Sequence, residues 1–245
     1  MLRHFGNKRT VAHNLRLAIL LCLTAGFVNA AGFLGFSALT TNVTGHAALL
    51  AEDIALSHWK DASIIAIWML LFLAGAFCSS IIINRVGLNQ RFSYVIPILL
   101  EIIILSICTL RGFHGYFLYA NEIFAGSLLF AMGLQNALVS VISGSVVRTT
   151  HLTGTFTDLG IDLAQLKIRN AKNQQEIYTR IKLRLSIILC FILGALMGAY
   201  LFNIVHFIAF IAPIILLVFA LFYDIFRLNV KRYYTQIIRQ LKNNK

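Results

Sequence analysis

Two copies of one short motif carry the residues best suited to binding a small ligand. The first reads TNVTG at residues 41–45 and the second reads THLTG at residues 150–154. Each places two threonine hydroxyls and a glycine at the start of a run that is typical of a short helix. A helix N-terminus offers free backbone N–H groups and a partial positive charge, which suits an anionic or carbonyl-bearing solute. The duplicated motif therefore predicts a solute-binding site.

The composition places these motifs in a membrane protein. Of the 245 residues, 59% are hydrophobic and only 12% are charged, whereas about 25% of a soluble domain is charged. A helix needs about 20 residues to cross the hydrocarbon core. Six apolar runs approach this length: Leu17–Phe36, Ser63–Ile83, Tyr94–Leu110, Phe117–Ile142, Leu185–Asn203 and Val205–Phe226. We expect an all-α polytopic membrane protein with six transmembrane helices.

The distribution of basic residues sets the expected orientation. The formal net charge is +12, and most basic residues precede the first run, separate the second from the third and the fourth from the fifth, or follow the sixth. Only Lys60 and Arg111 fall on the other side. Because basic loops stay in the cytoplasm, we expect both termini there, including a basic tail at 227–245. The charge indicates contact with the lipid bilayer and not with nucleic acid.

The motif pair belongs to a longer internal repeat. Three further landmarks recur in the same order: GFVNA at 26–30 with GLQNA at 133–137, FLAGAF at 72–77 with FILGAL at 191–196, and Pro97 with Pro213, the only two prolines. An ordered series of matches is strong support for duplication. We expect one transmembrane domain made of repeat 1, over about 17–111, and repeat 2, over about 117–226.

Each repeat contains three expected spans and one short helix, at Ala47–Leu56 and at Phe156–Leu166. Because an odd number of crossings reverses the side of entry, the halves are expected to be inverted repeats. If the short helices crossed fully, the halves would be parallel and the basic loops would no longer share a side. Charged residues such as Glu52 and Asp53 make full burial in lipid costly. We interpret both helices as re-entrant or interfacial half-helices.

Other polar residues complete the predicted solute site. Asn29 and Asn136 occupy equivalent positions in the helices that lead to the motifs, and Gln135 adjoins the second. An unpaired amide is costly in hydrocarbon, so each is expected either to lock two helices by a hydrogen bond or to contact the solute. The predicted substrate-binding residues are Asn29, Thr41, Thr44, Gly45, Gln135, Asn136, Thr150, Thr153, Gly154 and Asp158.

The same motifs have a purely structural interpretation. Thr44 and Thr153 could cap the two short helices, and Gly45 and Gly154 could simply let neighbouring helices approach. Elsewhere, Gly75 with Ser79, and Gly194 with Gly198, have the small-xxx-small spacing of close helix contacts. Within one chain these faces would join the two halves, and a homodimer contact is the alternative.

Glu101 interrupts the apolar run VIPILLEIIILSI, and its counterpart by the proline alignment is Leu217. A carboxyl group at this depth favours its neutral form and could carry a coupling proton. Alternatively, it sits neutral and hydrogen-bonded in the interior.

Enzymatic chemistry has the least support. Asp158 and His151 could act as acid and base on a lipid, but no nucleophile with a base and an orienting group accompanies them. His46 and His151 stand at different positions in the two motifs, which argues against a symmetric metal site, and no cysteine pair has metal-ligand spacing. We expect no enzyme activity, no metal and no cofactor.

The segments GFVNAAGFLGF and TNVTGHAALL, together with AMGLQNALVSVISGSVVRTTHLTGTFTDLGIDLA, resemble the YoaK-like family of bacterial integral membrane proteins, DUF1275. The resemblance covers nearly the whole chain and implies a multi-pass protein of the bacterial cytoplasmic (inner) membrane with about six spans. The family typically carries an aspartate where this chain has Asn29, and Thr-Gly-Asn where it has His46. No activity is established for it.

These observations lead to two functional hypotheses. The first is a small transporter-like protein that binds a small, anionic solute between the two Thr-Gly half-helices. The second is a membrane scaffold or regulatory subunit whose repeat serves only for packing, with a partner bound by the cytoplasmic segment 150–184.

Overall fold

The computed structural model describes residues 11–87, 92–110, 119–168 and 174–222. Within these ranges the chain is helical apart from turns and short loops, as the hydropathy pattern predicts. The described elements are α1 (Val11–Phe36), α2 (Val43–Ala55), α3 (Trp59–Val86), α4 (Phe92–Leu110), α5 (Ala120–Ser143), α6 (Leu152–Ile168), α7 (Gln174–Val205), the 3-10 helix η4 (His206–Phe210) and a helical stretch at 211–222.

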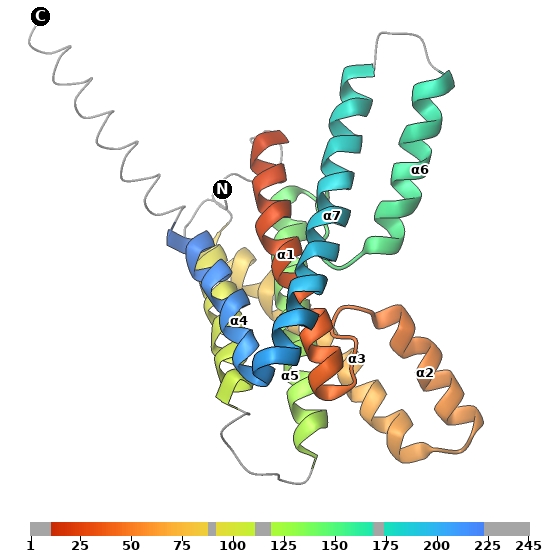
Figure 1. Ribbon diagram of the computed structural model, residues 1–245, viewed down its shortest axis with the longest axis vertical. Helices are drawn as coiled ribbons and strands as arrows, with labels where there is room; N and C mark the ends of the chain where they lie inside the picture. Colours follow the sequence, from red (N-terminus) through yellow and green to blue (C-terminus); the bar gives the residue numbers. More distant parts are fainter. Residues whose placement is uncertain (1–10, 88–91, 111–118, 169–173, 223–245) are drawn as a thin grey trace, which may run out of the picture.

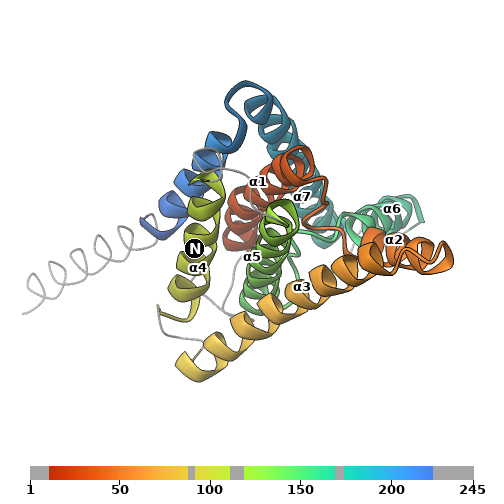
Figure 2. The ribbon, with the colours of Figure 1, turned by 90° about the horizontal axis from the view of Figure 1, so that it is seen from below.

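Five helical segments of the described chain are long and apolar enough to cross a membrane: Ile19–Phe36, Trp59–Val86, Ser93–Leu110, Ala120–Ser143 and Gln174–Phe222. The last has 49 residues, more than twice the roughly 20 that one crossing needs. Figures 1 and 2 show the chain reversing at η4, after which 211–222 lies near α4. The sequence divided this segment into two expected spans, and the end of the second, together with the tail at 227–245, lies outside the described residues.

The central helices α1 and α5 each pack against a helix of the other half of the chain. α1 lies on α7, and α5 lies on α3. The two central helices run in opposite directions in Figure 1. Apolar side chains such as Leu70, Leu73 and Phe77 remain exposed on the outer face of α3, where a membrane protein meets lipid. The apolar runs are therefore divided between a packed interior and a lipid-facing surface.

Glycines bring α1 and α7 into backbone contact. A Cβ atom on Gly26 would overlap the carbonyl oxygen of Phe191, and a Cβ atom on Gly194 would overlap the carbonyl oxygen of Leu23. No side chain fits between the helices at these two positions. Small residues permit such close approach where the hydrophobic effect does not drive helices together, as in a bilayer.

The contact between α3 and α5 is built in the same way. A Cβ atom on Gly75 would overlap the carbonyl oxygen of Phe130, and one on Gly133 would overlap that of Phe72. The repeat alignment pairs the residues of the two contacts one by one: Gly75 with Gly194, Phe72 with Phe191, Gly133 with Gly26 and Phe130 with Leu23. The expectation that the small-residue faces join the two halves of one chain is confirmed.

The two short helices lie on one side of the molecule and diverge. In Figure 1, α2 runs downward from mid-height and α6 runs upward from mid-height, and Figure 2 shows both on the same side. α2 packs against α3, and α6 packs against α7. Both helices begin four residues earlier than the sequence predicted, at Val43 and Leu152.

Candidate functional site

The first motif begins α2, and its cap is Asn42. The Asn42 side-chain oxygen accepts a hydrogen bond of 2.9 Å from the Gly45 N–H, which is the usual role of an N-cap residue. A Cβ atom on Gly45 would overlap the Asn42 side chain. The prediction that Thr44 caps this helix is wrong, because the helix begins at Val43 and Thr44 is already inside it, with its side chain exposed.

His151 occupies the equivalent place before α6. A Cβ atom on Gly154 would overlap the His151 ring, and the His151 carbonyl accepts hydrogen bonds from the N–H and the hydroxyl of Thr155. Thr153 lies inside the helix and is exposed. In both motifs the glycine therefore makes room for the residue that precedes its own helix, and not for a neighbouring helix.

Asn29 stabilises the turn of the first motif. Its Oδ1 atom accepts hydrogen bonds from the Thr41 N–H at 3.1 Å and from the Thr41 hydroxyl at 2.9 Å. Of the two roles expected for the amides, a structural hydrogen bond or a contact to the solute, Asn29 therefore has the structural one. The equivalent Asn136 differs, because its buried Oδ1 atom has no hydrogen-bond partner within the described ranges.

Gln135 links the two central helices through one of its two side-chain polar atoms. Its Nε2 atom donates a 2.9 Å hydrogen bond to the Leu21 carbonyl of α1. Its Oε1 atom, in a fully buried side chain, has no partner among the residues that the structure describes. An interhelical bond of this kind typically contributes about 0.6–2 kcal/mol.

Sequence analysis missed two further residues. Thr40 and Thr149 each precede the first threonine of a motif; both are fully buried, and neither hydroxyl has a hydrogen-bond partner in the described part of the chain. The signal was present in the sequence, because both motifs are preceded by a threonine and so begin with the doublet TT. Together with Gln135 and the partly buried Asn136, they are four residues that each carry a buried polar atom without a hydrogen-bond partner in the described chain, here called the unpaired group.

Asp158 lies in an ion-pair network between α6 and α7. Its carboxylate is 3.3 Å from Arg184 Nη2. The buried Asp162 pairs with Arg184 and, at 3.1 Å, with Arg180 Nε, while Arg180 also donates to Gln165. Two arginines beside one buried carboxylate compensate its charge, as the burial of an ionised group requires. The network fastens α6 to α7.

His46 is a buried residue that binds the backbone just before the first motif. Its Nε2 atom lies 2.9 Å from the Leu39 carbonyl, and its ring meets Trp68 edge-on at 5.6 Å between centroids. The pKa of His46 is lowered, because burial lowers it more than the hydrogen bond to Leu39 raises it. Because a carbonyl can only accept, Nε2 carries the proton in this hydrogen bond.

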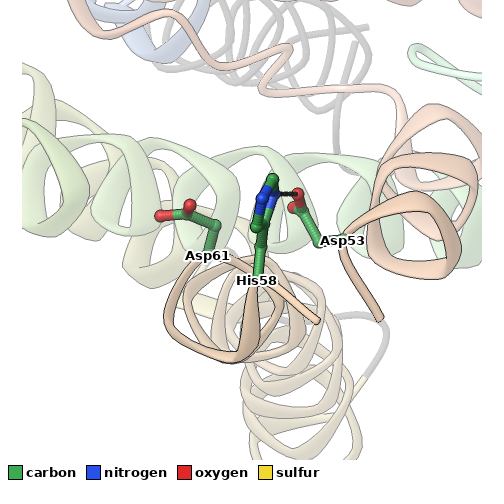
Figure 3. A group of neighbouring side chains, drawn as sticks. All are labelled: Asp53, His58 and Asp61. Atoms are coloured by element: carbon green, nitrogen blue, oxygen red, sulfur yellow. Dashed lines mark ion pairs between the residues drawn. The ribbon is translucent and has the colours of Figure 1, made fainter. Parts of the chain in front are cut away.

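Three side chains at the turn between α2 and α3 could together contact a cation. Asp53, His58 and Asp61 each offer one ligand atom, and these atoms lie within 4.8 Å of one another (Figure 3). His58 Nδ1 is 3.5 Å from Asp53 Oδ1. His58 and Asp61 are exposed, and Asp61 also complements the dipole in the first turn of α3. Asp53 lies near the end of α2, His58 directly precedes α3 and Asp61 lies in the first turn of α3, so we assign the three residues to the turn between the two helices.

Glu101 faces the interior of the bundle from α4. The residue is fully buried, and neither carboxyl oxygen has a hydrogen-bond partner within the described ranges. Its counterpart Leu217 is also fully buried. At these two equivalent buried positions, the first half of the chain therefore has a carboxyl group and the second half has an apolar side chain.

Comparison with protein families gives one finding. The family described as "Protein of unknown function (DUF1275)" matches residues 17–223. No curated protein matches the chain, and no solved structure does.

Proposed function

The chain belongs to the DUF1275 family, as its motifs indicate, and we propose that it is a small transporter-like protein of the bacterial cytoplasmic membrane. The solute is small and anionic or carbonyl-bearing, and it binds between the two Thr-Gly turns. The observation that carries the proposal is the unpaired group: Thr40, Gln135, Asn136 and Thr149. Leaving a buried polar group unpaired costs about 1–3 kcal/mol, and such a cost is offset where a ligand supplies the partner.

Inverted repeats are part of this proposal. Three features support them: the opposite directions of α1 and α5, the divergence of α2 and α6 from mid-height, and the equivalent glycines in the two large helix contacts. In transporters with inverted repeats, the substrate lies near the midplane, where broken helices present their ends. The basic residues support cytoplasmic termini.

The turns supply further contacts to the proposed solute. Thr44 and Thr153 expose their hydroxyls in the first turns of α2 and α6, beside N–H groups that have no partner within a helix. Thr41, Gly45, Thr150 and Gly154 belong to the same turns. Asn29 acts through its bonds to Thr41, and we propose Glu101 as the carrier of a coupling proton.

Cysteine labelling tests the inverted arrangement. We expect Ala47→Cys, in a protein lacking its four native cysteines, to react with a membrane-impermeant thiol reagent only from outside. Phe156→Cys should react only from the cytoplasm. Both side chains are exposed, so burial does not prevent the reaction. Labelling of both from one side would make the repeats parallel and contradict the proposal.

Solute flux tests the site itself. Purified protein in liposomes would be given a proton gradient and a panel of small carboxylates and inorganic anions. Replacing Thr40 and Thr149 together by valine removes two buried hydroxyls at nearly constant shape. Because a hydrogen bond to a charged solute contributes about 1.5–3 kcal/mol, we expect flux to fall at least about tenfold.

A matched control is available in Thr24 and Thr109. These threonines are buried as well, but their hydroxyls already donate to the Leu20 and Leu105 carbonyls of their own helices. Their double replacement by valine should leave flux within about twofold. Unchanged flux after replacement of Thr40 and Thr149 would refute the site. Absence of flux for every probe, with a protein partner recovered on segment 150–184, would favour the scaffold hypothesis.

A further inference from the structure

A cavity of about 480 Å³ that is open to the surface lies between α3, α4 and α5. Its volume falls within the range of about 300–1,000 Å³ that is typical of ligand pockets. The walls are mainly apolar, with Ile64 and Trp68 from α3, Ile104 from α4, and Ile123 and Phe130 from α5. None of the residues that line it belongs to the predicted solute site. The three helices are all candidate membrane spans, so an apolar occupant is available from the bilayer.

Charged and aromatic groups stand at one end of this cavity. α3 and α5 both begin there, and Tyr119 and Glu122, at the start of α5, line the cavity. Lys60 precedes Ile64 by one helical turn, and its ammonium group lies 5.0 Å from the centre of the Tyr119 ring. Starts of spanning helices lie near the lipid headgroups, where tyrosine is favoured and where a lysine side chain can extend its ammonium group toward the headgroups.

Trp68 fixes the wall next to this charged end. Its indole N–H donates a 2.9 Å hydrogen bond to the Glu122 carbonyl, which joins α3 to the first turn of α5. The indole also borders the cavity. The hydrogen bond between Trp68 and Glu122 therefore holds an apolar wall of the cavity next to its charged end.

We propose that the cavity binds one acyl chain of a phospholipid whose headgroup carries a primary amine. The acyl chain fills the apolar walls, the phosphate lies near the Lys60 ammonium, and the amine lies near the Glu122 carboxylate. A cation and a carboxylate at one opening complement a zwitterionic headgroup. A headgroup without an amine would also place its phosphate near Lys60 but would leave the Glu122 carboxylate without an opposite charge. This site is independent of the proposed solute site.

Fluorescence of Trp68 tests the acyl chain. The chain has two tryptophans, so Trp59→Phe leaves Trp68 as the only one. In detergent solution, phosphatidylethanolamine with brominated acyl chains should quench Trp68 saturably, and unbrominated phosphatidylethanolamine should reverse the quenching. Ile104→Phe should fill the cavity and abolish saturable quenching. Ile64→Phe serves the same purpose from α3 if the first variant does not purify as a monodisperse protein.

Ile103→Phe is the matched control, because Ile103 neighbours Ile104 on α4 but is 53% exposed and does not line the cavity. This variant should retain the quenching of the parent protein. Equal quenching in Ile103→Phe, Ile104→Phe and Ile64→Phe would mean that lipid contacts Trp68 without entering the cavity, and would overturn the proposal.

The headgroup is tested by comparing phosphatidylethanolamine with phosphatidylglycerol in the same assay. Glu122→Gln should lower the preference for the amine headgroup by about twofold to fivefold, the range that a partly exposed ion pair supplies. Lys60→Gln should weaken both lipids by a similar factor. Equal affinity for the two lipids in the parent protein would refute the amine headgroup and indicate a non-specific annular lipid.

Discussion

Replacing Gly75 by alanine should destabilise the protein by about 2–3 kcal/mol, because the added methyl group has no space. Its Cβ atom would overlap the backbone carbonyl oxygen of Phe130 on α5. A flexible side chain could move aside, but a helix backbone cannot, so α3 and α5 would have to separate along their contact. Thermal unfolding in detergent, followed by tryptophan fluorescence, should show a melting temperature lower by about 4–12 °C.

Two other glycines complete this experiment. Gly194→Ala should cost a similar free energy, because its Cβ atom would overlap the Leu23 carbonyl oxygen in the equivalent contact of α1 with α7. Gly160→Ala is the control, since a Cβ atom there meets nothing within 4 Å, and alanine should stabilise this helix by up to about 1 kcal/mol. Equal melting temperatures for Gly75→Ala and Gly160→Ala would contradict the close contact of α3 with α5.

Glu101→Leu is expected to stabilise the fold and to abolish coupling to protons. Removing a buried carboxyl group that has no hydrogen-bond partner in the described chain recovers about 1–3 kcal/mol. The free energy of unfolding should rise by that amount in a denaturant titration. In the flux assay, an imposed proton gradient should no longer accelerate solute uptake. A residue that lowers stability and supports activity is the expected mark of a functional group.

Leu217→Glu is the reciprocal change, because Leu217 is the counterpart of Glu101 and is equally buried. It should destabilise the protein by a comparable or larger amount and should create no proton coupling. Glu101→Gln separates the two effects: the amide keeps the polarity of the site but cannot titrate, so stability should change little while coupling is lost. Undiminished proton stimulation of flux in Glu101→Gln would exclude Glu101 as the carrier.

The polar residues of the two turns were partly predictable. The sequence pointed to Asn29 and Asn136 as equivalents, and their position at the turns follows from the repeat. It could not show that Asn29 is paired with Thr41 while Asn136 keeps a buried oxygen without a partner in the described chain. Pairing depends on where a loop of a slightly different length returns to its helix, and no local pattern encodes that distance.

Asp158 illustrates the same limit. It was among the predicted substrate-binding residues, but its carboxylate pairs with Arg184. Arg184 comes 26 residues later and on another helix, so only the packing of α6 against α7 brings the two together. The cavity between α3, α4 and α5 is equally invisible in the sequence, because three separated helices line it.

By itself, the sequence determined the helical, apolar character of the described chain, predicted two related halves, and identified Gly75 and Gly194 as helix-contact residues. Hydropathy, small-residue spacing and duplication are local properties, and each constrains one helix at a time. Only the tertiary structure decided which buried polar atoms are paired, which residue caps α2, and where a cavity remains. Those features depend on the relative placement of helices, since a hydrogen bond exists only when donor and acceptor come within about 3 Å of each other.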